Sequence, residues 1–225
     1  GISQSVLERN QVRFNGREIM FPYFRNGELI NIKYRTLDKK FRQEAGADKI
    51  FYGLDDINGF TYCVIVEGEL DKLALEEVGY TNVLSVPDGA PAPNTKSYES
   101  KFSYIVNCQK ELEGVTQFIL AVDSDAPGKK LEEELSRRLS PEKCWVITWP
   151  DGCKDANDVL IKHDEFELLK VLDNAKPIPI SGLFNVNDFS EELLKLYDDG
   201  CRGGESTGWF SLDPYYTVRQ GEMTI

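Results

Sequence analysis

Four acidic side chains follow short apolar runs, close to the point where each run ends. Glu67 directly follows the run at 62–66, Asp123 follows the run at 117–122 with Asp125 two residues further on, and Asp155 comes after the run at 144–148. Carboxylates that share one site repel one another unless a cation neutralises them. Hard oxygen donors of this kind suit Mg²⁺ or Mn²⁺ rather than zinc. The four acids therefore predict a divalent-metal site of the type that supports phosphoryl transfer.

Other interpretations of neighbouring residues remain open. Glu69 and Asp71 fit the first turn of a helix, where a negative charge interacts favourably with the helix dipole. The stretch 123–134 imitates an EF-hand calcium loop, but Pro127 occupies its fifth position and a buried strand precedes it where a helix is required. The dipeptide Gly128-Lys129 lacks the upstream glycine of a phosphate-binding P-loop, so no nucleoside-triphosphatase site is predicted there.

Short apolar runs alternate with helical patterns between residues 59 and 176. Strands are predicted at 62–66, 82–86, 117–122 and 144–148, and helices at 70–78, 98–112 and 129–139. This alternation is typical of a parallel sheet that is covered by helices on both faces, so the predicted fold class is α/β. Since ligands bind outside the carboxyl ends of such strands, the four acids should point into one crevice.

The first 58 residues predict a small α+β subdomain. A short helix in the first 15 residues, capped by Ser3 or Ser5, leads into a strand. The dipeptide Asn26-Gly27 joins two further strands at 18–24 and 29–35. Both residues of this dipeptide accept the positive φ of a type I′ turn, which indicates a β-hairpin.

The charge of the chain is divided unevenly. The formal net charge is −12, yet residues 1–45 carry nine Lys or Arg against five acids, a net of +4, which leaves −16 for the rest. Such a split is typical of a protein in which one part meets a polyanion and another binds cations. Lys33 and Arg35 are two residues apart on a strand and share one face. The cations that follow them, Lys39, Lys40 and Arg42, are predicted in a polar turn.

Neither a structural zinc site nor a membrane span is predicted. The five cysteines are widely scattered, none forms a C-x-x-C pair, and His163 is the single histidine. This pattern favours a reducing compartment without a disulfide framework. No apolar run approaches the ~18–20 residues of a membrane helix. Because Gly1 is not a natural start, we expect any targeting segment to lie upstream.

A second, smaller part of the chain is predicted after the α/β domain. The prolines within 177–179 indicate a boundary because they stop regular structure. The helix predicted at 188–197 is amphipathic, 200–204 reads as a flexible turn, and 221–225 looks like the opening of a buried strand. We expect the helix to pack on a neighbouring subunit when further domains form a ring, and the isolated chain to be a monomer.

Three motifs together resemble the signature of the Toprim family, the metal-binding fold of bacterial-type primases, topoisomerases and some nucleases. They are Val66-Glu67-Gly68-Glu69-x-Asp71, Val122-Asp123-Ser124-Asp125-x-x-Gly128-x-Lys130 and Lys154-Asp155-Ala156-Asn157-Asp158. The last motif is similar to that of the T-odd phage primase–helicases and their organellar relatives of the Twinkle type, and 86–94 resembles the plant form. This resemblance divides the chain into an N-terminal subdomain of the RNA polymerase region (1–58), a Toprim domain (59–176), a linker with a helix (177–204) and the opening of a helicase domain (205–225).

The resemblance implies a DNA primase, a DNA-directed RNA polymerase that makes short RNA primers on a single-stranded template. Glu67, Asp123, Asp125 and Asp155 would hold two Mg²⁺ or Mn²⁺ ions, and this chain would bind no zinc. Lys33 and Lys39 match basic residues that would contact the incoming triphosphate or the template. Further cations expected to bind nucleotide or DNA are Arg35, Lys40, Arg42 and Lys154.

The resemblance also implies partners and a location. The expected partners are single-stranded DNA, ribonucleoside triphosphates, and a zinc-binding domain and a helicase domain in the same or another chain. The expected compartment is the mitochondrion, the chloroplast or both, with a phage or bacterial cytoplasm as the alternative. Two other functions stay open, namely a Toprim nuclease and a non-catalytic module that binds single-stranded DNA and assembles with partners.

Overall fold

The N-terminal segment folds into an antiparallel sheet that follows one short helix. In the computed structural model, which describes residues 1–92, 98–180, 182, 184, 186–200 and 204–218, helix α1 (Gln4–Arg9) begins at the N-cap Ser3. Strands β1 (Arg13–Phe14), β2 (Glu18–Arg25), β3 (Glu28–Thr36) and β4 (Phe41–Gln43) follow in that order across the sheet. Asn26 and Gly27 have φ values of 52° and 78°, which confirms the predicted hairpin turn.

The fourth strand corrects one prediction. Arg42 was expected in a polar turn, but it lies in β4, opposite Tyr34 of β3. The backbone reverses before β4, at Lys39, whose φ is 65°. A strand of only three residues with a Phe-Arg-Gln sequence has too few apolar positions to show an alternating pattern.

The second sheet is mainly parallel and has the strand order β6-β5-β7-β8-β9. Its four parallel strands occupy the predicted segments: β5 (Tyr62–Val66), β6 (Val83–Ser85), β7 (Gln117–Ala121) and β8 (Cys144–Val146). The fifth strand, β9 (Lys176–Pro177), pairs antiparallel to β8. The prolines at 177–179 were expected to end regular structure at a boundary, and β9 does end at Pro177, next to the division between the two compact units. An edge strand tolerates proline because one side of it makes no ladder bonds.

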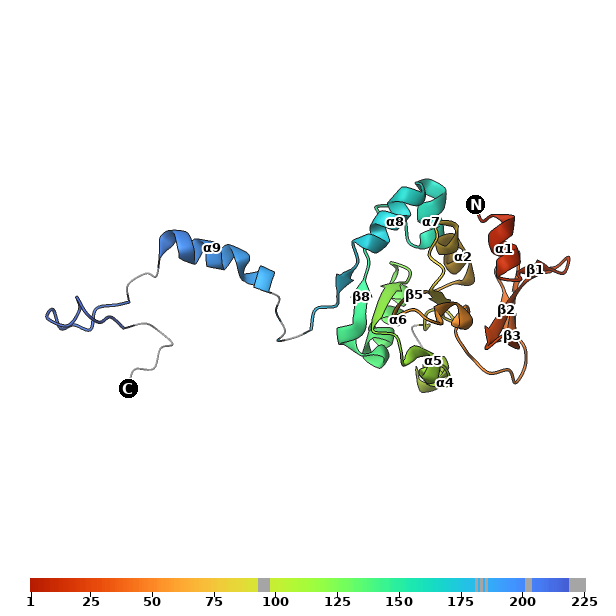
Figure 1. Ribbon diagram of the computed structural model, residues 1–225, viewed down its shortest axis with the longest axis horizontal. Coiled ribbons are helices and arrows are strands. Elements are labelled where there is room, and N and C mark those ends of the chain that lie inside the picture. Colours follow the sequence, from red (N-terminus) through yellow and green to blue (C-terminus); the bar gives the residue numbers. More distant parts are fainter. Residues whose placement is uncertain (93–97, 181, 183, 185, 201–203, 219–225) are drawn as a thin grey trace. The chain divides into compact units, whose positions relative to one another are not determined.

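Helices cover both faces of the parallel sheet, as predicted for the α/β class. In Figure 1, α7 (Ala156–Lys162) and α8 (Glu165–Asp173) lie on one side of β5, and α4 (Ser103–Asn107) and α5 (Gln109–Leu112) lie on the other. The other helices of this unit are α2 (Glu69–Glu77), α3 (Tyr98–Lys101), α6 (Ala126–Leu139) and the 3₁₀ helices η1 (Leu54–Ile57) and η2 (Pro141–Lys143).

Three short helices replace the single helix that was predicted at 98–112. The chain leaves helical geometry at Phe102 and again at Cys108, where ψ rises to 13° and 15°. These breaks allow both Phe102 and Tyr104 to be buried although they are only two residues apart. On an uninterrupted helix, residues two apart point in different directions, so the two rings would face opposite ways.

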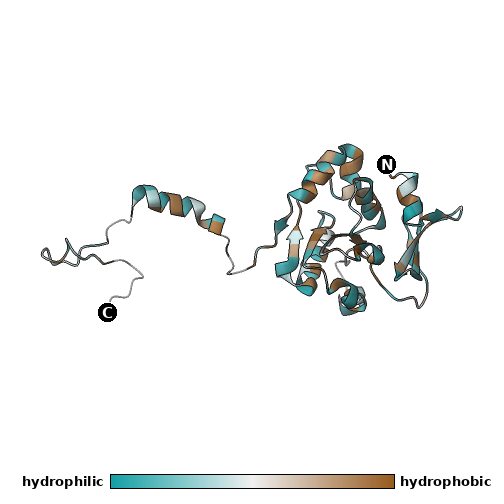
Figure 2. Ribbon diagram, in the orientation of Figure 1, coloured by the Kyte–Doolittle hydropathy of each residue, from teal (hydrophilic) through white to brown (hydrophobic). Residues whose placement is uncertain are grey.

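The strands of the parallel sheet contribute alternate residues to two apolar clusters. Cys63 and Ile65 of β5 belong to one cluster, and Val64 and Val66 belong to the other. The first cluster also contains residues of α4 to α6 and of the antiparallel sheet, and the second contains residues of α7 and α8. Figure 2 shows hydrophobic residues gathered along these strands. Residues 1–178 consequently form one compact unit with both sheets in it.

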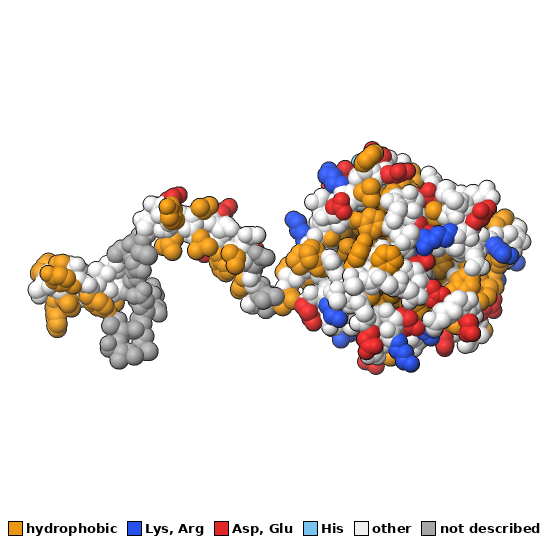
Figure 3. All heavy atoms as spheres, in the orientation of Figure 1, with side chains coloured by type: hydrophobic (Ala, Val, Ile, Leu, Met, Phe, Trp, Pro, Cys, Tyr) orange, Lys and Arg blue, Asp and Glu red, His pale blue; other side chains and the backbone are white. Residues whose placement is uncertain are grey.

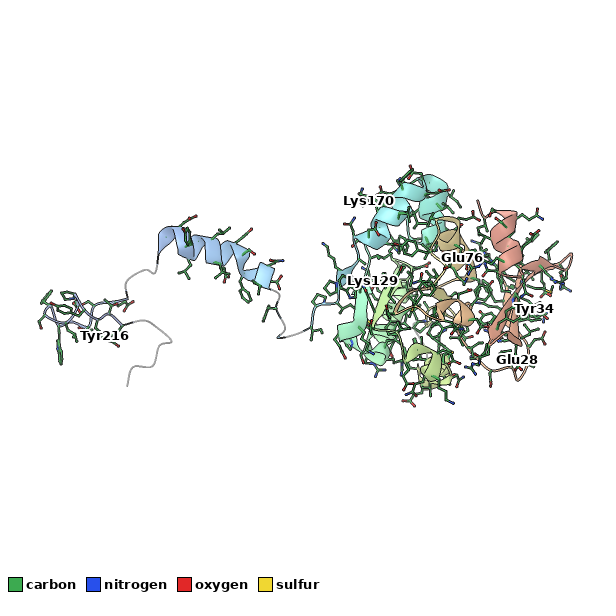
Figure 4. All side chains as sticks on the ribbon, viewed as in Figure 1. Glu28, Tyr34, Glu76, Lys129, Lys170 and Tyr216 are labelled. Carbon is green, nitrogen blue, oxygen red and sulfur yellow. The ribbon has the colours of Figure 1, made fainter. Side chains whose placement is uncertain are left out.

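A buried cation joins α1 to the parallel-sheet region. The Lys72 side chain is fully buried, and its Nζ lies 2.8 Å from Asp56 Oδ2 and 2.9 Å from Asn10 Oδ1, and also contacts Glu76. Arg9 of α1 pairs with Glu76 at 3.1 Å; Figure 4 labels this glutamate on α2. Several partners compensate the buried Lys72 charge, which would otherwise be costly. The predicted boundary between the subdomain at 1–58 and the domain at 59–176 therefore runs through a shared core. The two domains stay a prediction.

The second compact unit comprises Pro179–Ile225. It holds η3 (Val186–Phe189) and α9 (Ser190–Asp199), close to the helix expected at 188–197, and every residue of α9 is exposed. An isolated antiparallel bridge joins Glu205 to Val218. The strand expected at 221–225 and most of the expected turn at 200–204 lie outside the described residues. Within the part of the chain that the structure describes, no helix has the length and apolarity needed to cross a membrane.

Candidate active site

The carboxyl ends of β5 and β7 bring two of the predicted acids to one edge of the parallel sheet. Glu67 directly follows β5, Asp123 comes two residues after β7, and the neighbouring register pairs Val66 with Ala121. Asp155 is the N-cap of α7, in the loop after β8, and its side chain accepts a hydrogen bond from the Asp158 N–H at 2.7 Å. The structure thus places Glu67, Asp123 and Asp155 at one edge.

These acids line a cleft of about 780 Å³ whose opposite wall is the antiparallel sheet. On the face of the molecule seen in Figure 3, acidic and basic side chains are interspersed. In the cleft, by contrast, acids gather on the wall formed by the parallel sheet and cations on the wall formed by β3 and β4. The predicted residues that line it are Lys33, Arg35, Lys39, Arg42, Glu67, Asp123, Lys154 and Asp155.

Glu67 has one oxygen without a partner. Its Oε1 accepts a hydrogen bond from the Ala90 N–H at 3.1 Å, whereas its Oε2 is buried and unpaired among the described residues. Burial and the negative charge of Asp123 raise the pKa of Glu67 to about 6. A buried carboxylate oxygen without a donor is costly, so this position favours a cation.

Lys154 bridges the other two acids. Its Nζ lies 2.8 Å from Asp123 Oδ2 and 3.0 Å from Asp155 Oδ2. Burial raises the pKa of Asp123, and the hydrogen bond from Lys154 opposes that rise. Two contacts hold the loops together below these side chains. The Ser124 N–H donates to the Lys154 carbonyl at 3.0 Å, and the buried Trp149 indole N–H donates to the Val122 carbonyl at 2.8 Å.

Asp125 has a different place from the other predicted acids. It is exposed, it does not line the cleft, and as the N-cap of α6 it accepts a hydrogen bond from the Gly128 N–H at 2.9 Å. A side chain at position 128 would put its Cβ 2.0 Å from the Asp123 carbonyl oxygen, so glycine is needed for α6 to start this close to Asp123. Metal binding by Asp125 stays a prediction.

Two acids that were predicted in the first turn of a helix do lie there, in α2, and they also have specific contacts in the cleft. Asp71 lines it and accepts a hydrogen bond from the Asn157 N–H at 3.3 Å, and burial together with the charges of Asp155 and Asp123 raises its pKa well above the usual value. Glu69 is buried and binds Lys33. The position of Asp71, in the first turn of a helix that starts at the carboxyl edge of the sheet, was the signal that could have identified it.

Lys33 is fixed by its neighbours on the opposite wall. Its Nζ lies 2.7 Å from Glu69 Oε1, and the Tyr23 hydroxyl donates to the same oxygen at 2.6 Å. The side chains of Lys33 and Glu69 are 8% and 4% exposed. Burial and the charge of Glu69 raise the pKa of Tyr23, which keeps its hydroxyl a donor. Lys33 consequently presents an ammonium group at a defined position of the cleft wall.

The cations of the antiparallel sheet have different neighbours. Lys33 Nζ and the Arg35 guanidinium lie 5.1 Å and 5.6 Å from the centre of the Phe41 ring. Arg42 donates two hydrogen bonds to Glu18, at 2.9 Å and 2.7 Å, and stacks on Tyr34, which Figure 4 labels. Lys40 pairs with Asp38 at 2.8 Å and does not line the cleft. Lys39 does line it.

The donor set fits a hard divalent cation. It consists of carboxylates, one of them with a buried, unpaired oxygen, at the carboxyl edge of the sheet. Among the described residues, no three acidic, histidine or cysteine side chains already converge closely enough to hold one ion. Two of the acids, Asp123 and Asp155, instead share the ammonium group of Lys154. Opposed carboxylates and cations of this kind can bind the metal and the phosphates of a nucleotide, respectively.

Comparison with known proteins shows what this chain is similar to. Residues 62–148 match the Toprim domain. The chain is 42% identical over its whole length to the Arabidopsis thaliana protein "Twinkle homolog protein, chloroplastic/mitochondrial", and covers 34% of it. It is 44% identical over 80% of its length to the Arabidopsis thaliana "Primase homolog protein", and covers 58% of that protein. The chain therefore spans a third to somewhat over half of these curated relatives.

Solved structures show the same fold. The primase domain of bacteriophage T7, in a complex with a DNA polymerase and an RNA/DNA hybrid, has a TM-score of 0.67 and 26% identity over 79% of this chain and 89% of that one. The Escherichia coli primase catalytic core has a TM-score of 0.58 at 17% identity, covering 85% and 74% of the two chains, and shows the fold alone. Residues 62–148 of this chain thus match the Toprim domain, and the chain is similar to a Twinkle homolog protein and a primase homolog protein of Arabidopsis thaliana and to the primase domain of bacteriophage T7.

Proposed function

We propose that this chain is the RNA polymerase part of a DNA primase and makes short RNA primers on single-stranded DNA. The observation that carries the proposal is the cleft between the two sheets. Carboxylates at the ends of β5 and β7 and after β8 face Lys33, Arg35 and Lys39 across a space of about 780 Å³. A template-directed polymerase needs both walls, because it must bind catalytic metal and polyanionic substrates side by side.

The acidic wall would bind the metal. Glu67, Asp123, Asp125 and Asp155 would hold two Mg²⁺ or Mn²⁺ ions, with the unpaired Glu67 Oε2 as one ligand atom. When bound, such ions lower the pKa of the attacking hydroxyl and neutralise the phosphates of the incoming nucleotide. In the reaction, the 3′-hydroxyl oxygen of one nucleotide forms a bond to the α-phosphorus of the next, and the bond to pyrophosphate breaks.

The basic wall would bind and orient the substrates. Lys33, fixed by Glu69, would contact the triphosphate, and Lys39 would contact the triphosphate or the template. Arg35 and Arg42 lie on the same wall, and Phe41 offers an exposed ring on which a base could stack. Lys40 and Lys154 complete the set of nucleotide-binding and DNA-binding cations in this proposal.

The proposed partners and compartment follow the relatives. The phage T3 relative is a DNA helicase/primase, so a helicase domain and a zinc-binding domain would complete this chain's activity, in the same or another chain. A plant relative is a chloroplastic/mitochondrial protein, which favours one or both of these organelles, with a phage or bacterial cytoplasm as the alternative. The linker at 177–204 and the opening of a helicase domain at 205–225 belong to the same proposal.

Primer extension tests this function. A short RNA annealed to a DNA template, given ribonucleotides with Mg²⁺ or Mn²⁺, should be extended by the wild-type chain and by Asp151→Asn, whose exposed carboxylate lies outside the cleft. Asp123→Asn should abolish extension. Loss of the RNA or template would instead indicate a nuclease. Absence of extension by the wild-type chain, with metal still bound in calorimetry, would indicate a DNA-binding module or a need for further domains.

A further inference from the structure

Lys154 is already a cation at the position where the acids of the cleft require one. Its ammonium group lies within 3.0 Å of one oxygen of Asp123, which follows β7, and one of Asp155, the N-cap of α7. The side chains of these two acids are only 14% and 13% exposed, whereas that of Lys154 is 56% exposed. The acids are thus held in place, and their counterion can leave.

We propose that Lys154 is a displaceable counterion, which neutralises Asp123 and Asp155 in the metal-free protein and is released toward the nucleotide when a divalent ion takes those carboxylates. The inference rests on the metal site of the proposed function. It assigns Lys154 two successive partners, first the acids and then a phosphate group, and so couples the binding of metal to the binding of substrate.

Two of the lysines that line the cleft, Lys33 and Lys154, differ in a way that supports this role. The Lys33 side chain is 8% exposed and paired with the buried Glu69, so removing it from its partner would leave a buried charge uncompensated. Lys154 is mostly in solvent, and its flexible four-carbon stem can move its charge at little cost. Its backbone is fixed, because its carbonyl accepts from the Ser124 N–H at 3.0 Å, so the released ammonium stays at the cleft.

Charge balance gives the order of events. Without any cation, Asp123 and Asp155 would repel one another and the nearby Glu67. Lys154 supplies one positive charge to this group, and a divalent ion supplies two. The ion therefore displaces the Lys154 ammonium group from the carboxylates when its concentration is sufficient. The released charge then adds to the positive wall formed by Lys33 and Arg35. The cleft therefore favours a triphosphate more strongly after metal has bound than before.

Metal titration tests the first half of the proposal. Binding of Mn²⁺ alone should be measured by electron paramagnetic resonance on the full chain. Lys154→Met removes the competing charge and should bind Mn²⁺ about tenfold more tightly, a change equivalent to about 1.4 kcal/mol. Lys154→Arg keeps the charge and should bind like the wild type. Lys162→Met is the matched control. Lys162 also pairs with an acid, Asp158, at 2.9 Å; both residues belong to α7, and Lys162 does not line the cleft.

Nucleotide titration tests the second half. At saturating Mn²⁺, calorimetry should show that Lys154→Met binds a ribonucleoside triphosphate about tenfold more weakly than the wild type, since a charge-assisted contact to phosphate is lost. Mn²⁺ affinity that is unchanged or weaker in Lys154→Met overturns the proposal, and so does nucleotide affinity equal to that of the wild type. Neither titration requires polymerisation, so failure of primer extension and failure of this inference remain distinguishable.

Discussion

The ion pair of Lys33 and Glu69 predicts a large loss of stability from the smallest possible change. Glu69→Gln keeps the shape of the side chain and an acceptor for the Tyr23 hydroxyl, but removes the negative charge 2.7 Å from Lys33 Nζ. Both side chains are more than nine-tenths buried. Removing one partner of such a pair typically costs about 3–5 kcal/mol. That is a substantial part of the about 5–15 kcal/mol by which a domain is stable.

Burial, rather than distance, determines this magnitude. Lys130 and Glu133 on α6 are also 2.7 Å apart, but their side chains are 45% and 67% exposed. An exposed pair contributes about 0–1 kcal/mol, so Glu133→Gln is the matched control. Urea unfolding measures the free energy of unfolding of each variant. The double variant Lys33→Met with Glu69→Gln leaves no uncompensated charge and should recover part of the loss.

Two results would refute the reasoning about Glu69. Equal losses in Glu69→Gln and Glu133→Gln would mean that the buried pair contributes no more than a surface pair. The second result is a double variant whose loss of stability equals the sum of the losses in Glu69→Gln and Lys33→Met. Such additivity would mean that the two side chains are energetically independent.

Three further predictions concern the carboxyl edge of the parallel sheet. Gly128→Ala should lower both the free energy of unfolding and the Mn²⁺ affinity, because its Cβ would stand 2.0 Å from the Asp123 carbonyl oxygen; Gly114→Ala, which meets nothing within 4 Å, should change neither. Trp149→Phe leaves the Val122 carbonyl without its donor and should cost about 1–3 kcal/mol in urea unfolding, and an unchanged midpoint would contradict this. In metal-free buffer, the pKa of Glu67 is raised from 4.5 to about 6, so the folded state binds its proton more tightly than the unfolded state. Its contribution to stability should therefore fall as pH rises through that window, and a pH series of urea unfolding in which Glu67→Gln keeps the wild-type slope would disprove it.

The strands of the parallel sheet could be predicted from sequence because both of their faces are buried. A continuous run such as that of β5, bounded by turns, has few alternatives, and β5 starts and ends at the predicted residues. The helices α7 and α8 were not predicted, although Asp155 and Asp164 cap them. Only a short break separates the two helices, and α7 has only two buried residues. The apolar pattern of each helix is therefore too short to be recognised in the sequence.

Topology also allowed part of the site to be predicted. The rule that parallel strands end at one edge was enough to bring Glu67, Asp123 and Asp155 together. It could not show that Asp125 caps α6, because an N-cap and a metal ligand have the same residue type and nearly the same position. Nor could it show that Glu69 binds Lys33, since Glu69 begins helix α2, Lys33 lies on strand β3, and the two meet only through the tertiary fold.

The ends of the parallel sheet determine how copies of this chain can associate. At one end, β9 covers β8, and Pro177 lacks the N–H group that a further strand would need. At the other end, Tyr52 and Ser85 exchange two backbone hydrogen bonds of 3.0 Å, which occupies part of the open side of β6. Sheet-to-sheet growth, a common route to aggregation, is thus hindered at both ends. A further subunit that contacts these two ends would then bind through side chains, and such a contact can be separated again without breaking a backbone ladder.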